Sequence, residues 1–495
     1  MSVAREKFNL HLKLLGVLLV AAFVGAAPLM AAREASPVAN VSQQSEGEIL
    51  LAQVGKPSAV RKSSEVKKKR PKPVKRKPKA KQPRKPRQKK KPAQPLPWPQ
   101  NIEAMAGKGA VLVVDFHAKP DEPKELIALN ADKDYVPASI LKLVTSGAAL
   151  VTLGPDYRFT TSFYIDKNKN LWVKGYGDPS LVGEEMCLIA EQLTFRGLTE
   201  INDIYIDSSF FQNGVVQDGT TFTNNPYDAF NSGFGVNFNT VTFLIDKSGN
   251  IVESSPCIPL TPIALDLAKK NFPKRKRRKS SVEKYLNISE SPAMAEQNGG
   301  QVLRELLIRR GVLVNGNIVT GQTVPHDATL VYDHLSSKNL EEMIRDLLKY
   351  SNNFMTNQIF LTMGAVVYGT PANFAKGTQV VHDFLANYGL PSLTLVEGSG
   401  LSRNNYVTAH QMSEVLKVME PVRTLIKSTD NGSVYYKTGT MTDIQTLAGY
   451  IERPGRPDEP LAFVILLNGK YATGTREKIL AELMSHFVEG TDTKS

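Results

Sequence analysis

A hydroxyl and an amine stand three residues apart at the start of an otherwise apolar segment. They belong to Ser139 and Lys142, in YVPASILKLVTSGAAL at 135–150. On an α-helix, residues i and i+3 lie about 5–6 Å apart, so the two groups can meet on one face. Burial disfavours a charged ammonium, and an uncharged amine beside a hydroxyl is a base beside a nucleophile. The pair therefore predicts nucleophilic catalysis at Ser139, with a serine that caps a helix N-terminus as the alternative.

Two later segments favour the catalytic interpretation. Ser-Asn-Asn at 351–353 falls between two helical patterns, and Lys-Thr-Gly-Thr at 437–440 falls on a predicted strand. Ser-x-x-Lys, Ser-x-Asn and Lys-Thr-Gly, in this order, form the motif set of penicillin-binding proteins and related β-lactamases. The Ser-x-x-Lys spacing also occurs at 64–67 and 281–284, but the surroundings there are polar, so the amine would stay hydrated and protonated.

Hydrophobic periodicity predicts the elements that carry these motifs. Strands are predicted at 110–117 and in SVYYKTGT, LAGYIE and LAFVILLNG. Helices are predicted at 134–153, in LEEMIRDLLKY and MTNQIFLTMGAVVY, and at 475–487. Strands at both ends with helices between them predict an α/β domain, a sheet covered by helices, formed by residues 101–156 and 335–495.

The segment at 157–334 has a different pattern. Short apolar alternations broken by Gly, Asn and Asp predict an inserted β-rich domain, and KRKRRK at 274–279 indicates a solvated loop in it. Cys187 and Cys257 fall in this segment, either as one disulfide or as two buried small apolar residues. Cysteines and histidines show no spacing typical of metal ligands, so we expect no metal and no cofactor.

The first 34 residues have the order of charge and hydrophobicity of an export signal. Arg5, Lys7 and Lys13 precede an uncharged run at 14–32, which predicts a signal peptide or, if it stays uncut, a membrane anchor. Either outcome places the remainder outside the cytoplasm, in the periplasm or cell envelope.

Residues 35–100 are predicted to be a disordered basic linker. Within it, 56–91 holds 19 Lys and Arg against one acid, Glu65, alternating with proline, so this stretch cannot bury a core. The whole chain has a formal net charge of +13, and this stretch accounts for all of the excess. Anionic lipid head groups or acidic wall polymers are the expected partners, with a plain spacer as the alternative; nucleic acid is an unlikely partner for an exported chain.

Around its motifs the chain resembles the low-molecular-weight class C penicillin-binding proteins. These are D-alanyl-D-alanine carboxypeptidases and endopeptidases, also called S13 peptidases. The stretches that carry the resemblance span about 101–490: PASILKLVTSGAAL, YGDPSL, NNPYDAFNSGFGVNFNTVTF, LLKYSNNFMTNQIF, EGSGLSRNNYVTAHQMSEVL and YYKTGTMTDIQTLAGYIE. The resemblance implies a β-lactamase/transpeptidase-like fold, an antiparallel sheet covered by helices, with domain material inserted between the first and second motifs.

The chain departs from the family pattern at two places, and the basic linker is not a family feature. Glu397 stands where the family usually has Asp before Gly-Ser-Gly, which we expect to change the loop geometry mildly. The insertion is short for a family that commonly nests two domains there, so we expect one of them to be reduced or missing.

The resemblance also implies a role for each motif residue. Ser139 would attack the D-Ala-D-Ala carbonyl, and an uncharged Lys142 would take its proton. Ser351 would relay a proton to the departing D-alanine while Asn353 holds the substrate amide and Lys142. The remaining roles fall on the third motif: Lys437 and Thr438 would bind the terminal carboxylate, Gly439 would let the substrate peptide approach the strand, and the backbone N–H groups of Ser139 and Thr440 would form the oxyanion hole.

Water would then cleave the acyl-enzyme, and β-lactams would acylate the same serine. Asp228 in PYDAF would reach toward the free amine of the third stem-peptide residue, with a turn aspartate as the alternative. Arg403 in GSGLSR would line the pocket, with a surface salt bridge as the alternative. The expected substrates are peptidoglycan stem peptides. The competing functions are a β-lactamase and a non-catalytic wall-binding scaffold of the same fold.

Overall fold

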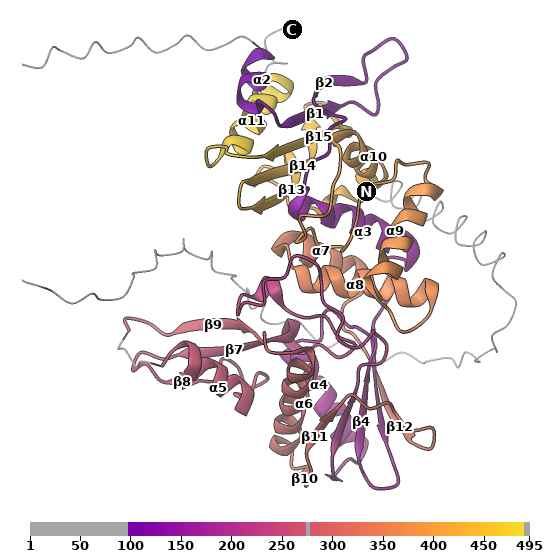
Figure 1. Cartoon of the computed structure of the whole chain (residues 1–495), viewed down its shortest axis with the longest axis vertical. Coiled ribbons are helices and arrows are strands. Elements are labelled where there is room, and N and C mark those ends of the chain that lie inside the picture. Colours follow the sequence, from indigo (N-terminus) through magenta and orange to yellow (C-terminus); the bar gives the residue numbers. More distant parts are fainter. Residues whose placement is uncertain (1–97, 274–277, 490–495) are drawn as a thin grey trace, which may run out of the picture. The chain divides into compact units, whose positions relative to one another are not determined.

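The computed structural model describes residues 98–273 and 278–489 (Figure 1). A five-stranded antiparallel sheet with the order β13-β14-β15-β1-β2 supports the motifs. Its strands are β13 (Val434–Met441), β14 (Ile444–Arg453), β15 (Arg456–Asn468), β1 (Ala110–Val114) and β2 (Glu125–Leu129). The first part of the described chain therefore pairs with its last part, because all of β1 pairs with β15. The strand β1 and the part of β15 that pairs with it are continuous apolar runs, as expected for strands with both faces covered.

Helices cover this sheet. They comprise α3 (Lys142–Thr152), α7 (Leu340–Tyr350), α8 (Asn353–Tyr368), α9 (Phe374–Asn387) and α10 (Ala409–Met419), with α10 packed on β15 and β1. Two further helices lie near the ends of the described chain, the short α2 (Gln100–Ala106) and α11 (Thr475–Met484). The helix α11 packs on β14. One apolar core joins α3, α7–α10 and the sheet, from Ala110 to Leu466. This is the predicted α/β arrangement of an antiparallel sheet covered by helices.

Several predicted boundaries were wrong by a few residues. The strand predicted at 110–117 ends at Val114. The helix predicted from 134 begins only at Ala138, as a 3-10 turn, η1 (Ala138–Leu141), that continues into α3. The physical reason is that Tyr135 exchanges backbone hydrogen bonds with Val407 at 2.9 and 3.0 Å, which keeps its backbone extended. The last helix predicted, 475–487, is α11 followed by one π-helical turn, η5 (Ser485–Glu489).

The segment between the first and second motifs contains two packed units rather than one. The larger has a sheet of order β11-β6-β4-β3-β12 with α4 (Gly183–Phe195) and α6 (Pro292–Arg309) against it. Its strands are β3 (Thr160–Ile165), β4 (Leu171–Gly175), β6 (Ile204–Asp207), β11 (Ile318–Thr320) and β12 (Thr329–Leu335), and β5 (Glu200–Ile201) pairs with β10 (Leu313–Val314) beside it.

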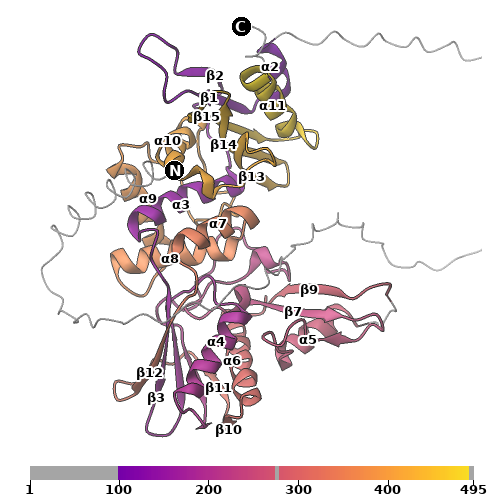
Figure 2. The same cartoon turned by 180° about the vertical axis from the view of Figure 1, so that it is seen from behind.

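The smaller unit has its own apolar core. It consists of β7 (Thr240–Ile245), β8 (Ile251–Val252) and β9 (Val282–Asn287), with α5 (Pro262–Asn271) packed on β7 (Figure 2). The insertion therefore contains a second, smaller packed unit, and we propose that this unit is the reduced second domain expected from the short insertion. Of the loop predicted at 274–279, only 278 and 279 are among the described residues. We propose 157–334 as the limits of the insertion, since β3 and β12, its first and last strands, pair with each other.

The helix α6 was missed because its sequence contains Gly299 and Gly300, which are typical of loops. In the structure the two glycines let the helix approach its neighbours closely. A Cβ on Gly299 would lie 2.9 Å from Phe234, and one on Gly300 would lie 2.5 Å from Ile318. These residues therefore serve helix packing, a requirement that arises only between segments far apart in the chain.

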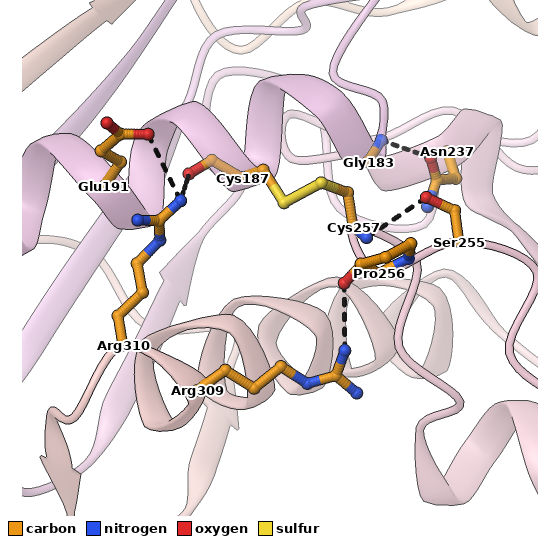
Figure 3. The surroundings of a disulfide bond; sticks show 9 residues. All are labelled: Gly183, Cys187, Glu191, Asn237, Ser255, Pro256, Cys257, Arg309 and Arg310. Carbon is orange, nitrogen blue, oxygen red and sulfur yellow. Dashed lines mark hydrogen bonds and ion pairs between the residues drawn. A yellow bond between two sulfur atoms is a disulfide. The ribbon is translucent and has the colours of Figure 1, made fainter.

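Cys187 and Cys257 form a disulfide, which decides between the two alternatives that the sequence left open (Figure 3). It joins α4 of the larger unit to the loop between β8 and α5 of the smaller one. The two Cα atoms lie 5.5 Å apart, within the usual range for a disulfide. Next to it, Arg310 donates to Cys187 O and Arg309 to Pro256 O. A structural disulfide is typical of proteins outside the cytoplasm.

Within residues 98–273 and 278–489, no helix combines the length and the apolar composition that a membrane crossing requires.

Candidate active site

Lys142 lies fully buried beside Ser139, at the junction of η1 and α3. Its Nζ is 3.2 Å from Ser139 Oγ, 2.7 Å from Asn353 Oδ1 and 2.6 Å from the carbonyl oxygen of Ser399. Burial lowers the pKa of Lys142 to about 7, against an opposing effect of the Glu397 carboxylate. A large uncharged fraction is therefore present at neutral pH.

An uncharged Lys142 matches these three contacts. An uncharged amine has two hydrogens and one lone pair. The two shorter contacts reach carbonyl oxygens of Asn353 and Ser399, which only accept hydrogen bonds. The lone pair is then left for the hydroxyl hydrogen of Ser139, so the geometry suits removal of that proton.

Lys437 holds the second serine of the site. Its Nζ donates to Ser351 Oγ at 2.8 Å and to Thr438 O at 2.8 Å, and its side chain is buried. Burial lowers its pKa well below the usual lysine value, and the charges of Lys142 and Arg476 lower it further. Ser351 ends α7 in a left-handed conformation, φ 56° and ψ 40°. Such a conformation is costly for serine, and residues held this way cluster at functional sites.

The strand β13 lies at the edge of its sheet, and residues 427–429 bridge its outer side at Val434–Tyr436. Tyr436 N–H points to this outer edge, because it donates to Lys427 O at 2.8 Å rather than to β14. Since backbone directions alternate along a strand, the amides of Thr438 and Thr440 point the same way. Thr438 is half-buried and Thr440 is exposed.

The packing of β13 requires a glycine at position 439. A Cβ there would lie 2.2 Å from Thr446 Oγ1 and 2.9 Å from the backbone nitrogen of Ser139. The resemblance assigned this glycine to substrate approach. The structure adds that only glycine lets β13 pack directly against the backbone of the nucleophile.

Glu397 organises the loop behind Lys142. Its buried carboxylate accepts hydrogen bonds from Ser399 N and Oγ, Gly400 N, Asn405 Nδ2 and Asn357 Nδ2, at 2.6–3.1 Å. The same loop presents Ser399 O to Lys142. The sequence marked position 397 only as a departure from Asp and gave no sign that it positions an acceptor for the base.

Asp228 is buried, and its carboxylate accepts hydrogen bonds from residues of its own loop. Its carboxylate accepts from the N–H and Oγ1 of Thr221 and of Thr223, at 2.6–3.2 Å. This is the geometry of the turn aspartate given as the alternative. The loop still reaches the site, because the neighbouring Tyr227 O accepts from Asn353 Nδ2 at 3.3 Å.

Arg403 is exposed and donates from Nη2 to Thr442 O at 2.7 Å, in the turn after β13. Among the described residues it forms no salt bridge. It lies beside the end of the motif strand.

Arg476, at the first turn of α11, contacts the motif strand and was missed by the sequence reasoning. Its Nη1 donates to Gly439 O at 2.5 Å and to Thr440 Oγ1 at 2.8 Å. It belongs to no motif and follows the third motif by more than 30 residues, so no sequence signal pointed to it.

Clusters of His, Cys, Asp and Glu that could bind a metal ion are absent from the part of the chain that the structure describes.

Comparison with protein families identifies the chain. The family model described as "D-Ala-D-Ala carboxypeptidase 3 (S13) family" matches residues 101–269 and 281–428. The chain belongs to this S13 family. The match contains the first and second motifs, and the Lys-Thr-Gly strand follows its end. Family membership makes the protein a serine-type D-Ala-D-Ala peptidase.

A curated relative and solved structures agree with this family assignment. The D-alanyl-D-alanine carboxypeptidase of Actinomadura sp. (strain R39) is 26% identical over 421 residues, covering 70% of this chain and 76% of the relative. The crystal structure of penicillin binding protein 4 (dacB) from Haemophilus influenzae aligns with a TM-score of 0.64 at 21% identity, over 78% of this chain and 98% of that one.

A second structure of that Haemophilus protein, in complex with a β-lactam, aligns with a TM-score of 0.60 at 19% identity, over 79% of this chain and 99% of that one. The fold is therefore that of a penicillin-binding protein, and the predicted β-lactamase/transpeptidase-like fold is confirmed.

Proposed function

We propose that this serine DD-peptidase hydrolyses the D-Ala-D-Ala bond of peptidoglycan stem peptides through an acyl-enzyme on Ser139. The observation that carries the proposal is the contact set of Lys142, whose two carbonyl acceptors leave its lone pair for the Ser139 hydroxyl.

Acylation follows from the positions of the site residues. Ser139 Oγ attacks the carbonyl carbon between the two D-alanines, and its proton passes to Lys142. The backbone N–H groups of Ser139 and Thr440 stabilise the oxyanion. As the C–N bond breaks, the proton taken up by Lys142 passes through Ser351 to the departing amine, which leaves Lys142 uncharged again. The Ser351 hydroxyl is held by Lys437.

Deacylation completes the cycle. Water, deprotonated by Lys142, attacks the ester carbon. The Ser139 oxygen leaves with a proton, so the products are a shortened peptide carboxylate and free D-alanine or, from a cross-link, a peptide amine.

Substrate recognition falls on the motif strand and the surrounding loops. Lys437 and Thr438 bind the terminal carboxylate, and the outer edge of β13 pairs with the extended peptide. Asp228 acts by shaping the loop at Asn353, and Arg403 by supporting the turn after β13. β-Lactams acylate Ser139, as the complex of the Haemophilus protein with a β-lactam suggests by analogy.

The protein acts outside the cytoplasm, and its disulfide supports this location. In this proposal, residues 1–34 serve as a signal peptide or an anchor. The basic linker at 35–100 contacts anionic lipid or wall polymers. Residues 1–97 lie outside the described part of the chain.

One experiment tests the reaction and its substrate together. Purified protein is incubated with muropeptide monomers and with cross-linked dimers, and the products are weighed by mass spectrometry. Loss of one alanine from monomers indicates carboxypeptidase activity, and conversion of dimers to monomers indicates endopeptidase activity. Intact substrates with an active, penicillin-labelled protein would refute the proposed substrate.

A further inference from the structure

The side chain of Arg476 reaches the motif strand from outside the three motifs. Nη1 donates to Gly439 O at 2.5 Å, to Thr440 Oγ1 at 2.8 Å and to Thr446 O at 3.2 Å, so a single guanidinium nitrogen joins β13 to β14. On its other side, Nε donates to Glu477 at 2.7 Å. The side chain is 13% exposed, which shows that its position is enforced by packing.

The carbonyl that Arg476 binds belongs to the same peptide group as the Thr440 N–H. A trans peptide is planar, and its C=O and N–H point in opposite directions. Gly439 O points to the Arg476 side, whereas the Thr440 N–H points to the outer edge of β13, as the Tyr436 amide shows by alternation. The Ser139 backbone lies against the face of β13 at this peptide, because the position of a Cβ on Gly439 is 2.9 Å from Ser139 N.

We propose that Arg476 is a positioning residue for the oxyanion hole, acting through the peptide group between Gly439 and Thr440. The inference rests on the proposed function, in which the Thr440 N–H donates to the oxyanion. A hydrogen bond from a charged donor to the carbonyl polarises the peptide and strengthens its N–H as a donor. The same bond fixes the peptide plane, so the N–H needs no reorientation during acylation.

A purely structural role would have a different signature. In that case Arg476 would only attach α11 to the sheet, and its loss would lower thermal stability without changing the chemistry selectively. The two roles are distinguished by how the variant changes two affinities, one for a tetrahedral transition-state analogue and one for a ground-state ligand.

The experiment measures acylation by a chromogenic cephalosporin in Arg476→Gln, Arg476→Lys and the control Lys478→Gln. Lys478 is an exposed cation on the same helix, so its variant loses the same charge away from β13. We expect Arg476→Gln to slow acylation at saturating β-lactam about 10-fold or more, less than the roughly 10²–10³-fold typical of deleting an oxyanion donor. Arg476→Lys should recover part of the rate, and Lys478→Gln should match wild type.

Binding measurements make the assignment specific. A peptidyl boronic acid, which forms a tetrahedral adduct with the serine, should bind Arg476→Gln more weakly by about the factor lost in acylation. The affinity for the product peptide ending in D-alanine should change less than about twofold. Equal losses for both ligands, or an unchanged acylation rate in Arg476→Gln, would overturn the inference.

A double-mutant cycle adds a test of the route. Thr440→Pro removes the N–H donor at an edge position where proline is tolerated. If Arg476 acts through this N–H, Arg476→Gln should slow acylation less than about twofold in the Thr440→Pro background but by nearly its full factor in Thr440→Val, which loses the Oγ1 contact and keeps the N–H. A full additional loss there would contradict the inference. Should wild type and Lys478→Gln both fail to acylate, the proposed function itself fails, an outcome distinct from failure of the role of Arg476.

Discussion

Lys142 Nζ lies 3.2 Å from Ser139 Oγ, and this is the longest of the three polar contacts that the amine makes. The two shorter contacts direct its hydrogens to carbonyl oxygens of other segments. In the uncharged amine, this separation of roles leaves the lone pair for the Ser139 hydroxyl. Three distant parts of the chain are needed to build this arrangement.

The first prediction concerns the nucleophile and its base. Ser139→Ala should abolish covalent labelling by fluorescent penicillin, and Lys142→Met should slow it by about 10²–10⁴-fold, the usual contribution of general base catalysis. Ser146→Ala is the matched control, since Ser146 is a buried serine on α3 whose Oγ has no hydrogen-bond partner. Labelling that persists in Ser139→Ala would refute the nucleophile assignment, measured by gel fluorescence and intact mass.

The second prediction is a pH dependence. Because burial lowers the pKa of Lys142 to about 7 and the uncharged amine is the active form, the acylation rate should rise with pH through about 7. The Glu397 carboxylate raises this pKa, so Glu397→Gln should move the midpoint to lower pH, while Glu397→Asp keeps the charge and should move it less. Rates of penicillin acylation between pH 5 and pH 9 measure it; a midpoint that moves upward in Glu397→Gln would contradict the assignment.

The third prediction concerns the close approach at Gly439. Gly439→Ala should slow acylation and destabilise the fold by about 1–3 kcal/mol, since the added methyl would overlap Thr446 Oγ1 and the Ser139 backbone. Gly147→Ala is the control, because its methyl would meet the flexible side chain of Met419 at 3.2 Å. Urea unfolding and acylation kinetics of both variants provide the measurement, and wild-type behaviour of Gly439→Ala would disprove the steric argument.

The fourth prediction concerns Asp228. Because its carboxylate accepts four hydrogen bonds from Thr221 and Thr223, Asp228→Asn should disturb the loop. Hydrolysis of peptides with a free amine on the third residue and of their acetylated counterparts should then fall by the same factor. A loss confined to the free amine would instead show that Asp228 binds the amine directly. Peptide hydrolysis rates decide between the two.

The fifth prediction concerns the disulfide. It closes a loop with a sequence separation of 70 residues, so Cys257→Ser should cost about 2–4 kcal/mol of unfolding free energy. Penicillin acylation should stay unchanged, because the bond joins the two units of the insertion rather than the motifs. Reductant should destabilise wild type and leave the variant without both cysteines unaffected; slower acylation in Cys257→Ser would show coupling between insertion and site.

The sequence by itself determined the chemistry of this protein. Three short motifs in order, each on the predicted type of element, predicted the nucleophile, the base and the carboxylate-binding strand, because these groups are recognised by residue type and local spacing. The long apolar strands and helices around them were found for the same reason, since their periodicity is local. The helix with Gly299 and Gly300 was missed because these glycines are needed for close packing against Phe234 and Ile318, which are distant in the chain.

Only the tertiary structure decided how the groups are tuned. The carbonyl of Ser399 that orients Lys142, the Glu397 carboxylate that holds its loop, and the guanidinium of Arg476 behind β13 come from segments without a motif. Their effects depend on burial and on distances of about 3 Å between segments hundreds of residues apart. Local spacing carries no such information, so the motif residues and an uncharged Lys142 could be predicted, whereas the groups from other segments that surround them could not.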